Sequence, residues 1–177
     1  MLLRIRNEAE ALALIREHPV VTVTPAGKLP SIVKMVVGGP VKGSWWGHPK
    51  GKLIFRICSA LGEHEDVLAV KLVDGKITFV HRALWPFLLR IVTDPGWRKS
   101  AEGSLGREAR RLLRQVERDG ELHLDPILAR ADTKPARAAH RAARDELEKS
   151  LLVLSTSKHT ESGRHEAVLI SWHHWQK

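Results

Sequence analysis

The feature that most constrains the fold is an order of predicted elements that occurs twice along the 177-residue chain. Each occurrence runs helix, strand, short helix, longer helix, strand, turn, strand. In the first occurrence the final turn is Val73-Asp74-Gly75, and Asp-Gly between two β-rich runs is a strong hairpin signal. The order predicts an α+β fold built from two copies of one small module.

The elements of the first copy follow from apolar spacing and from residues that end helices. Apolar residues recur at helical spacing before Pro19, and residues 20–24 are all β-branched. The predicted elements are helices over 7–18, 30–37 and 52–62, and strands over 20–24, 67–72 and 76–81.

The second copy shares little sequence with the first, so the matching order of elements is the evidence for it. Ser104 is expected to cap its first helix, and Asp125 followed by Pro126 is expected to start a short second helix. Its other predicted elements are helices over 105–118 and 134–149 and strands over 122–124, 151–157 and 165–170. The predicted domains are an N-terminal module over 1–92, a turn-rich linker over 93–103 and a C-terminal module over 104–177.

This order resembles the winged-helix arrangement, a helix-turn-helix variant with a β-hairpin wing, in two tandem modules. Residues 158–165 followed by Ser171-Trp172 resemble the final wing of bacterial winged-helix DNA-binding proteins. The resemblance implies binding to duplex DNA, with the longer helix of each module entering the major groove. It also implies a homodimer as one option, because winged-helix proteins often dimerise.

Relatives of that family include tandem winged-helix glycosylases that excise alkylated or crosslinked bases. Those enzymes use a short glutamine-containing catalytic motif in their N-terminal part. This chain has only Gln115 and Gln176, so the motif cannot be carried over.

The charge distribution favours a polyanionic partner. The net charge is +9, and residues 18–62 contain no Asp or Glu. An acid-free basic segment suits contact with phosphates, and a solvated surface without a partner is the alternative.

The most unusual motif is GSWWGHPKG at residues 43–51, which the element order places in a loop before the first recognition helix. Helix N-termini attract phosphate, and Lys50 and Lys52 add charge there. Trp45 and Trp46 offer flat faces that stack on bases or wedge between base steps. We expect one indole ring to be buried and the other exposed; burial of both rings is the alternative.

The second module offers a further basic surface. Arg137, Arg141 and Arg144 are spaced to share one helix face, with Ala138, Ala142 and Leu147 on the opposite side. The predicted DNA-binding residues of the whole chain are Lys42, Ser44, Trp45, Trp46, His48, Lys50, Lys52, Arg56, Arg137, Arg141, Arg144, Lys158 and Arg164.

An enzymatic alternative uses the same loop to receive a flipped nucleotide of damaged DNA. Trp45 or Trp46 would stack on the base, His48 would act as acid or base, and Lys50 or Lys52 would attack the sugar as an amine nucleophile. That chemistry is a base glycosylase or an abasic-site lyase, although no carboxylate lies nearby in sequence to activate water. Non-catalytic DNA binding is preferred; RNA binding and a protein partner held by the tryptophans remain alternatives.

Other function classes are disfavoured. The ten histidines show no H-E-x-x-H spacing, so neither a metal nor a cofactor is expected. The single cysteine, Cys58, excludes an internal disulfide and a cysteine-rich zinc site, and is expected to be a buried structural thiol. No apolar run approaches the roughly 20 residues of a membrane span, and the start does not resemble a signal peptide. A cytoplasmic, nucleoid-associated protein without a membrane partner is expected.

Overall fold

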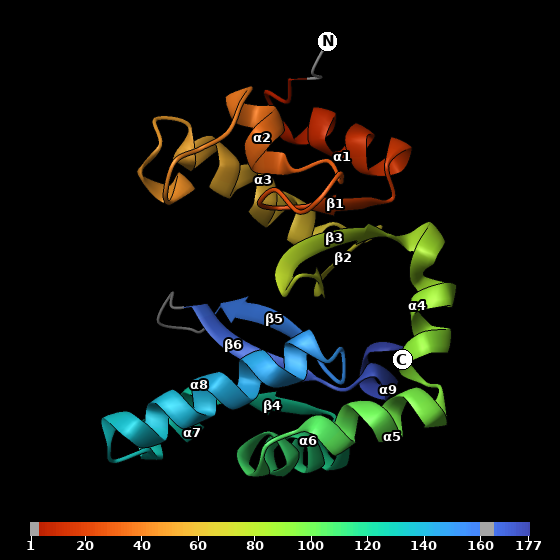
Figure 1. Ribbon diagram of the computed structural model, residues 1–177, viewed down its shortest axis with the longest axis vertical. Coiled ribbons are helices and arrows are strands. Elements are labelled where there is room, and N and C mark those ends of the chain that lie inside the picture. Colours follow the sequence, from red (N-terminus) through yellow and green to blue (C-terminus); the bar gives the residue numbers. More distant parts are fainter. Residues whose placement is uncertain (1–3, 160–164) are drawn as a thin grey trace. The chain divides into compact units, whose positions relative to one another are not determined.

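The computed structural model describes residues 4–159 and 165–177, and the chain forms two compact units, Met1–Phe87 (unit 1) and Leu88–Lys177 (unit 2) (Figure 1). Each unit contains one three-stranded antiparallel sheet together with several helices. The predicted α+β class is therefore confirmed. The boundary between the units falls within helix α4 (Trp85–Val92).

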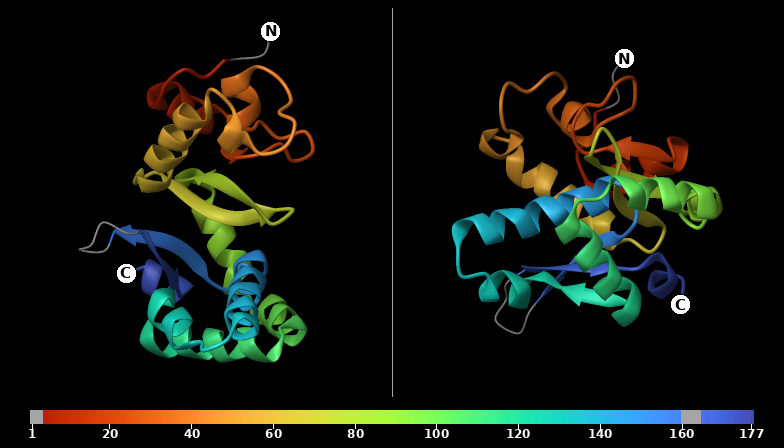
Figure 2. Two further views of the ribbon diagram at one scale, coloured as in Figure 1. Left: turned by 90° about the vertical axis from the view of Figure 1, so that its left-hand side faces the viewer. Right: turned by 60° about the horizontal axis from the view of Figure 1, so that its bottom comes forward.

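Unit 1 packs three helices against a small sheet (Figures 1 and 2). Its elements are α1 (Glu8–Glu17), β1 (Val20–Thr22), α2 (Ile32–Val37), the 3-10 turn η1 (Trp45–Gly47), α3 (Gly51–Glu63), β2 (Val67–Val73), β3 (Lys76–His81) and the 3-10 turn η2 (Arg82–Leu84). The strand order is β1-β3-β2, with Val80 of β3 paired with Val20 on one side and Leu68 on the other. The six helices and strands expected in this copy are present, with ends shifted by a few residues.

Side-chain caps and one tight turn fix the ends of these elements. Asn7 Oδ1 accepts a hydrogen bond from the backbone N–H of Glu10 (2.9 Å), and so begins α1. The β2–β3 turn places Asp74 and Gly75 at φ angles of 50° and 66°. Two successive left-handed residues are what a type I′ hairpin needs, which is why Asp-Gly predicted this turn correctly.

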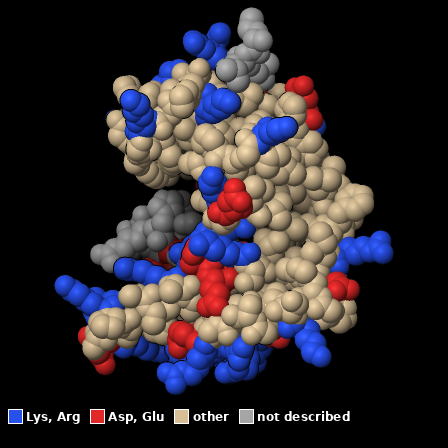
Figure 3. Space-filling model, viewed as in Figure 1, with Lys and Arg blue, Asp and Glu red and all other residues tan. Residues whose placement is uncertain are grey.

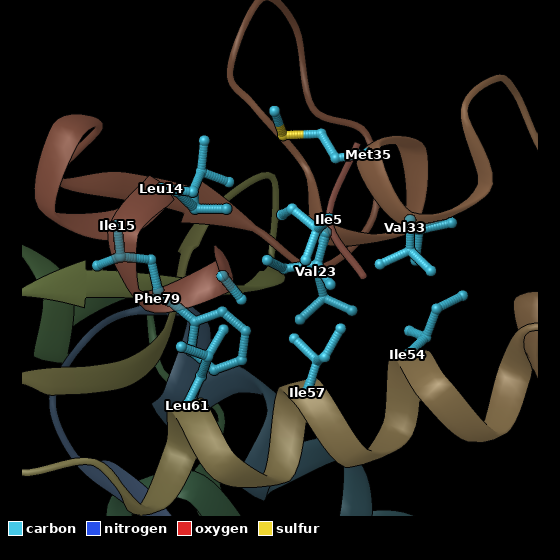
Figure 4. Packing of buried hydrophobic residues seen from close by; sticks show 14 of the residues in the cluster. Ile5, Leu14, Ile15, Val23, Val33, Met35, Ile54, Ile57, Leu61 and Phe79 are labelled. Atoms are coloured by element: carbon cyan, nitrogen blue, oxygen red, sulfur yellow. The ribbon is translucent and has the colours of Figure 1, made fainter. Parts of the chain in front are cut away.

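The core of unit 1 is formed by the inward faces of its helices and its sheet (Figure 4). Helix α3 contributes Ile54, Ile57 and Leu61, which lie on one face by their spacing. Leu14 of α1 and Phe79 of β3 pack in the same cluster. Because α3 turns this apolar stripe inward, its opposite face, which begins with Lys52, points to solvent.

Unit 2 repeats the order of unit 1. Its elements are α5 (Pro95–Ser104), α6 (Arg107–Asp119), β4 (Glu121–His123), α7 (Leu124–Arg130), α8 (Lys134–Lys149), β5 (Leu154–His159), β6 (His165–Ile170) and α9 (Trp172–Trp175). The strand order β4-β6-β5 matches β1-β3-β2 of unit 1 position by position. Leu112 of α6, Leu147 of α8 and Leu169 of β6 are fully buried in its own core.

The predicted turn-rich linker over 93–103 is wrong in its local structure, because most of it forms helix α5. Asp94 caps this helix by accepting from the backbone N–H of Trp97 (2.7 Å), and Pro95 occupies its first turn. The predicted cap at Ser104 is also wrong. Ser104 ends α5 and its hydroxyl donates to Ala101, whereas Gly106 precedes α6.

Two further predictions from the sequence concern the start of α7 and membrane-spanning helices. Helix α7 begins at Leu124, so Asp125 lies in its first turn rather than at the N-cap position. Within 4–159 and 165–177, no helix combines the length and apolar character needed to cross a membrane.

Candidate nucleic-acid interface

The segment between α2 and α3 is a hydrogen-bonded turn. Ser44 Oγ accepts from the backbone N–H of Trp46 (3.3 Å) and starts η1. The backbone N–H of His48 donates to the Trp45 carbonyl (3.1 Å), and the N–H of Lys50 donates to His48 Nδ1 (3.1 Å). Ser44 and His48, both predicted DNA contacts, therefore shape the turn that presents the tryptophans.

Gly51 allows this turn to lie directly against the start of α3. A Cβ atom at Gly51 would lie 2.9 Å from the carbonyl oxygen of Trp46 and 3.1 Å from that of Trp45. The first distance is too short for a side chain and the second is tight, and both neighbours are backbone atoms. The glycine thus holds both tryptophans close to the first turn of α3.

The two adjacent indole rings divide between core and surface. Trp45 is partly buried and packs against the core of unit 1. Trp46 stacks on it, with ring centroids 4.2 Å apart and planes inclined by 21°, while the residue stays 63% exposed. This is close to the expected pattern of one buried and one exposed ring.

The structure adds Phe55, which was not among the predicted DNA-binding residues. Phe55 is 46% exposed, and its ring centroid lies 5.4 Å from that of Trp46 with planes inclined by 42°. The exposure of residue 55 could have been inferred from the spacing of apolar residues in the sequence. Once Ile54, Ile57 and Leu61 fill the inward face of α3, helical spacing leaves residue 55 outside.

The cations predicted around this turn fall into two groups. Lys42 and Lys52 are exposed and make no ion pair with any described residue. Lys50 Nζ donates to the Val36 carbonyl at the end of α2 (2.7 Å), and Arg56 Nε lies 2.5 Å from Glu8 of α1. Lys50 and Arg56 therefore contact other residues of unit 1, which was not predicted from the sequence.

We call Lys42, Trp46, Lys52 and Phe55 the aromatic–basic surface. Lys52 and Phe55 lie one turn apart on the outward face of α3, and Lys42 and Trp46 belong to the segment that leads into it. In the view of Figure 3, Lys and Arg side chains are spread over unit 1 with few acidic side chains among them. The surface combines two exposed aromatic rings with two lysines that make no ion pair within the described part of the chain.

Two of the candidate catalytic groups have structural roles. The Lys50 amine donates to a carbonyl, and His48 Nδ1 accepts a backbone hydrogen bond. Lys50 Nζ and His48 Nδ1 are thus engaged in hydrogen bonds within unit 1 in this conformation. Lys52 and Trp46 are exposed, but the enzymatic interpretation needs a base beside them.

The three arginines of the predicted α8 face differ in their contacts. Arg137 Nε donates to the Ala131 carbonyl (3.0 Å), and Arg144 binds Glu148 (2.9 Å) and the Ser155 hydroxyl (3.0 Å). The predicted apolar face is wrong, since Ala138 and Ala142 are exposed; Ala143 and Leu147 fill the core instead. Arg144 is turned inward because it lies one residue from Ala143 and one helical turn from Leu147. Arg141 is exposed and makes no ion pair within the described part of the chain.

The predicted second wing is described only in its strands. Lys158 belongs to β5, and its backbone is paired with Glu166 of β6. Arg164 falls in 160–164, outside the described residues. The lysine of the first wing, Lys76, donates to the Pro25 carbonyl (2.6 Å), which ties that hairpin to its own unit.

Metal binding finds no support in the residues that the structure describes, which contain no group of three or more His, Cys, Asp or Glu side chains arranged to hold an ion. Comparison of the chain with protein-family models, with curated proteins and with solved structures found no match.

Proposed function

We propose that the protein binds DNA through the aromatic–basic surface of unit 1. The observation that carries this proposal is the position of Trp46, which is 63% exposed yet held in place by stacking on Trp45. Burying a tryptophan side chain is strongly favourable, so an exposed indole that is fixed in one orientation is well suited to meet a ligand. Bases are ligands with a flat apolar face.

The charge of the surface selects nucleic acid over a neutral aromatic ligand. Lys42 and Lys52 are exposed without ion pairs among the described residues, and the surrounding segment 18–62 contains no acidic residue. Lysines that contact phosphates release condensed counterions, which favours binding at low salt. The same cations would gain little from an uncharged partner.

The architecture supports a winged-helix interpretation of both units. The order helix, strand, helix, helix, strand, strand occurs in each, and the strand orders β1-β3-β2 and β4-β6-β5 are equivalent. In that interpretation α3 is the recognition helix of unit 1, and the aromatic–basic surface lies at its N-terminal end, where base contacts are made. In unit 2, α8 is the recognition helix; Arg137 and Arg141 are both exposed and make no ion pair among the described residues, although Arg137 donates to the Ala131 carbonyl.

Non-catalytic binding fits the contacts better than repair chemistry. Lys50 Nζ donates to the Val36 carbonyl at the end of α2, and His48 Nδ1 accepts from the backbone N–H of Lys50; these residues are one candidate nucleophile and the candidate acid or base of the enzymatic alternative. Homodimer formation and association with the nucleoid remain predictions from the sequence.

The experiment is a titration of labelled duplex DNA followed by fluorescence anisotropy at several salt concentrations. Wild type should show an affinity that falls steeply with salt, and the double variant K42A/K52A should lower the log–log slope by roughly 1–2. The matched control is the double variant K99A/K177A, which removes two other exposed lysines, both in unit 2. A salt-independent affinity, or an unchanged slope in the double variant, would contradict the proposal.

A further inference from the structure

We infer that the preferred DNA ligand of the aromatic–basic surface carries an unpaired base, which stacks on the open face of Trp46. This inference rests on the proposed function and specifies its ligand class. The base that stacks on Trp46 would be single-stranded or extrahelical. The edge of a paired base would not bind in this way.

The geometry of the Trp45–Trp46 stack favours a flat ligand on Trp46. Trp45 covers one face of the Trp46 indole at a centroid separation of 4.2 Å. Phe55 borders the ring at a tilt of 42° and so does not lie flat on it. Because Trp46 stays 63% exposed although Trp45 covers one face of its ring, we expect the opposite face to be accessible to a ligand. A base placed there would extend the stack of two indoles by one ring.

Few of the outward residues of α3 can recognise the edges of paired bases in the major groove. Paired bases present hydrogen-bond donors and acceptors there, which Arg, Lys, Asn and Gln recognise. The outward residues of the first turns of α3 are Lys52, Phe55 and Arg56, and Arg56 is held by Glu8. Only Lys52 remains to recognise base edges, whereas an aromatic face accepts any unpaired base.

The Trp46 ring is held in one orientation before any ligand binds. Trp46 is fixed by the Ser44 cap, by its stacking on Trp45 and by the close approach of Gly51 to its carbonyl. A ring that is already ordered loses little conformational entropy when a base stacks on it. Stacking also has little base specificity, so we expect weak dependence on sequence.

The test compares two labelled duplexes of equal length, one fully paired and one with a single central unpaired adenine. Wild type should bind the bulged duplex about tenfold more tightly, because one base–aromatic stack changes affinity by this order. Trp46→Ala should abolish the difference, and Trp46→Phe should retain part of it. Phe87→Ala, which removes another exposed aromatic ring, should leave the difference intact.

The outcomes separate this inference from the proposed function. Equal affinity for the two duplexes, or a preference that survives in Trp46→Ala, would overturn the inference. If Trp46→Ala then still weakened binding to both duplexes, the proposed function would stand without it. Absence of salt-dependent binding to either duplex would overturn both. Because Trp46 is exposed, its variants are expected to fold, and circular dichroism checks this.

Discussion

Trp45 and Trp46 are neighbours in sequence, yet their indole rings stack at 4.2 Å while only Trp45 packs against the core of unit 1. Adjacent residues in a strand point to opposite faces, so this arrangement depends on the 3-10 turn η1. The turn lets the buried ring support the exposed one. The predictions that follow test this support, the charges around it and two groups elsewhere in the chain.

Replacing Gly51 with Ala should destabilise unit 1 and weaken DNA binding. The added methyl group would lie 2.9 Å from the Trp46 carbonyl oxygen, so η1 or the start of α3 must move. Overpacking of this kind costs about 1–3 kcal/mol of unfolding free energy. Chemical denaturation and anisotropy measure both effects. Gly47→Ala, in the same turn with nothing within 4 Å of its added Cβ, is the matched control and should change neither.

Replacing Glu8 with Gln should strengthen DNA binding. Glu8 lies 2.5 Å from Arg56 and offsets its charge beside the aromatic–basic surface. Its pKa is lowered by a backbone hydrogen bond within Glu8 and by Arg56, so the carboxylate is ionised at neutral pH. Once freed, Arg56 can contact phosphate, and the salt slope should steepen by about 0.7–0.9.

The control for this charge change is Glu17→Gln at the other end of α1, which alters the net charge equally. An increase in affinity that both variants share would indicate a general charge effect and contradict a local role for Arg56.

The ring of His123 should titrate above its ordinary pKa of 6.5. A hydrogen bond to Glu166 (2.8 Å) is the main cause of its raised pKa, and Glu121 (3.3 Å) adds to it. Protonated His123 therefore stabilises the folded state fully below pH 6.5, and this contribution is lost as pH rises through the folded pKa. Because the side chain is 40% exposed, solvent screens the pair and the effect on stability is small.

A proton NMR titration of the histidine rings measures this directly. Glu166→Gln should return the midpoint of His123 toward 6.5. An equal midpoint in wild type and variant would show that Glu166 does not set it.

Cys58 should react slowly with thiol reagents in the native protein. It is partly buried against the core of unit 1, and burial raises the pKa of its thiol to about 12. Since the thiolate is the reactive form, alkylation at pH 8 should be about two to three orders of magnitude faster in denaturant. Mass spectrometry follows the reaction with iodoacetamide. Similar rates with and without denaturant would contradict this burial.

The parts of the fold set by local chemistry could be predicted from the sequence. Asp74-Gly75 specified its hairpin because few residues tolerate two left-handed φ angles in succession. The predicted helix over 134–149 has the bounds of α8, where Thr133 caps the first turn. The predicted N-cap at Ser104 was wrong because Ser104 is the last residue of helix α5.

The candidate site was predictable in its location but not in its contacts. An acid-free segment with two tryptophans identified the turn before α3. The contacts of Lys50 with Val36 and of Arg56 with Glu8 join residues far apart in sequence, so spacing could not reveal them. Phe55 was not predicted because an apolar residue in an amphipathic helix is ordinarily expected on its buried face, whereas Phe55 is 46% exposed.

The most direct test of the central claim is ultraviolet crosslinking of the protein to DNA, followed by tryptic digestion and mass spectrometry. The peptide of residues 43–50 contains Trp45 and Trp46, and the peptide of residues 53–56 contains Phe55. The account predicts nucleotide adducts on these two peptides, with the adduct on the first lost in Trp46→Ala. Adducts confined to peptides of unit 2, or an adduct on residues 43–50 that persists without Trp46, would contradict it.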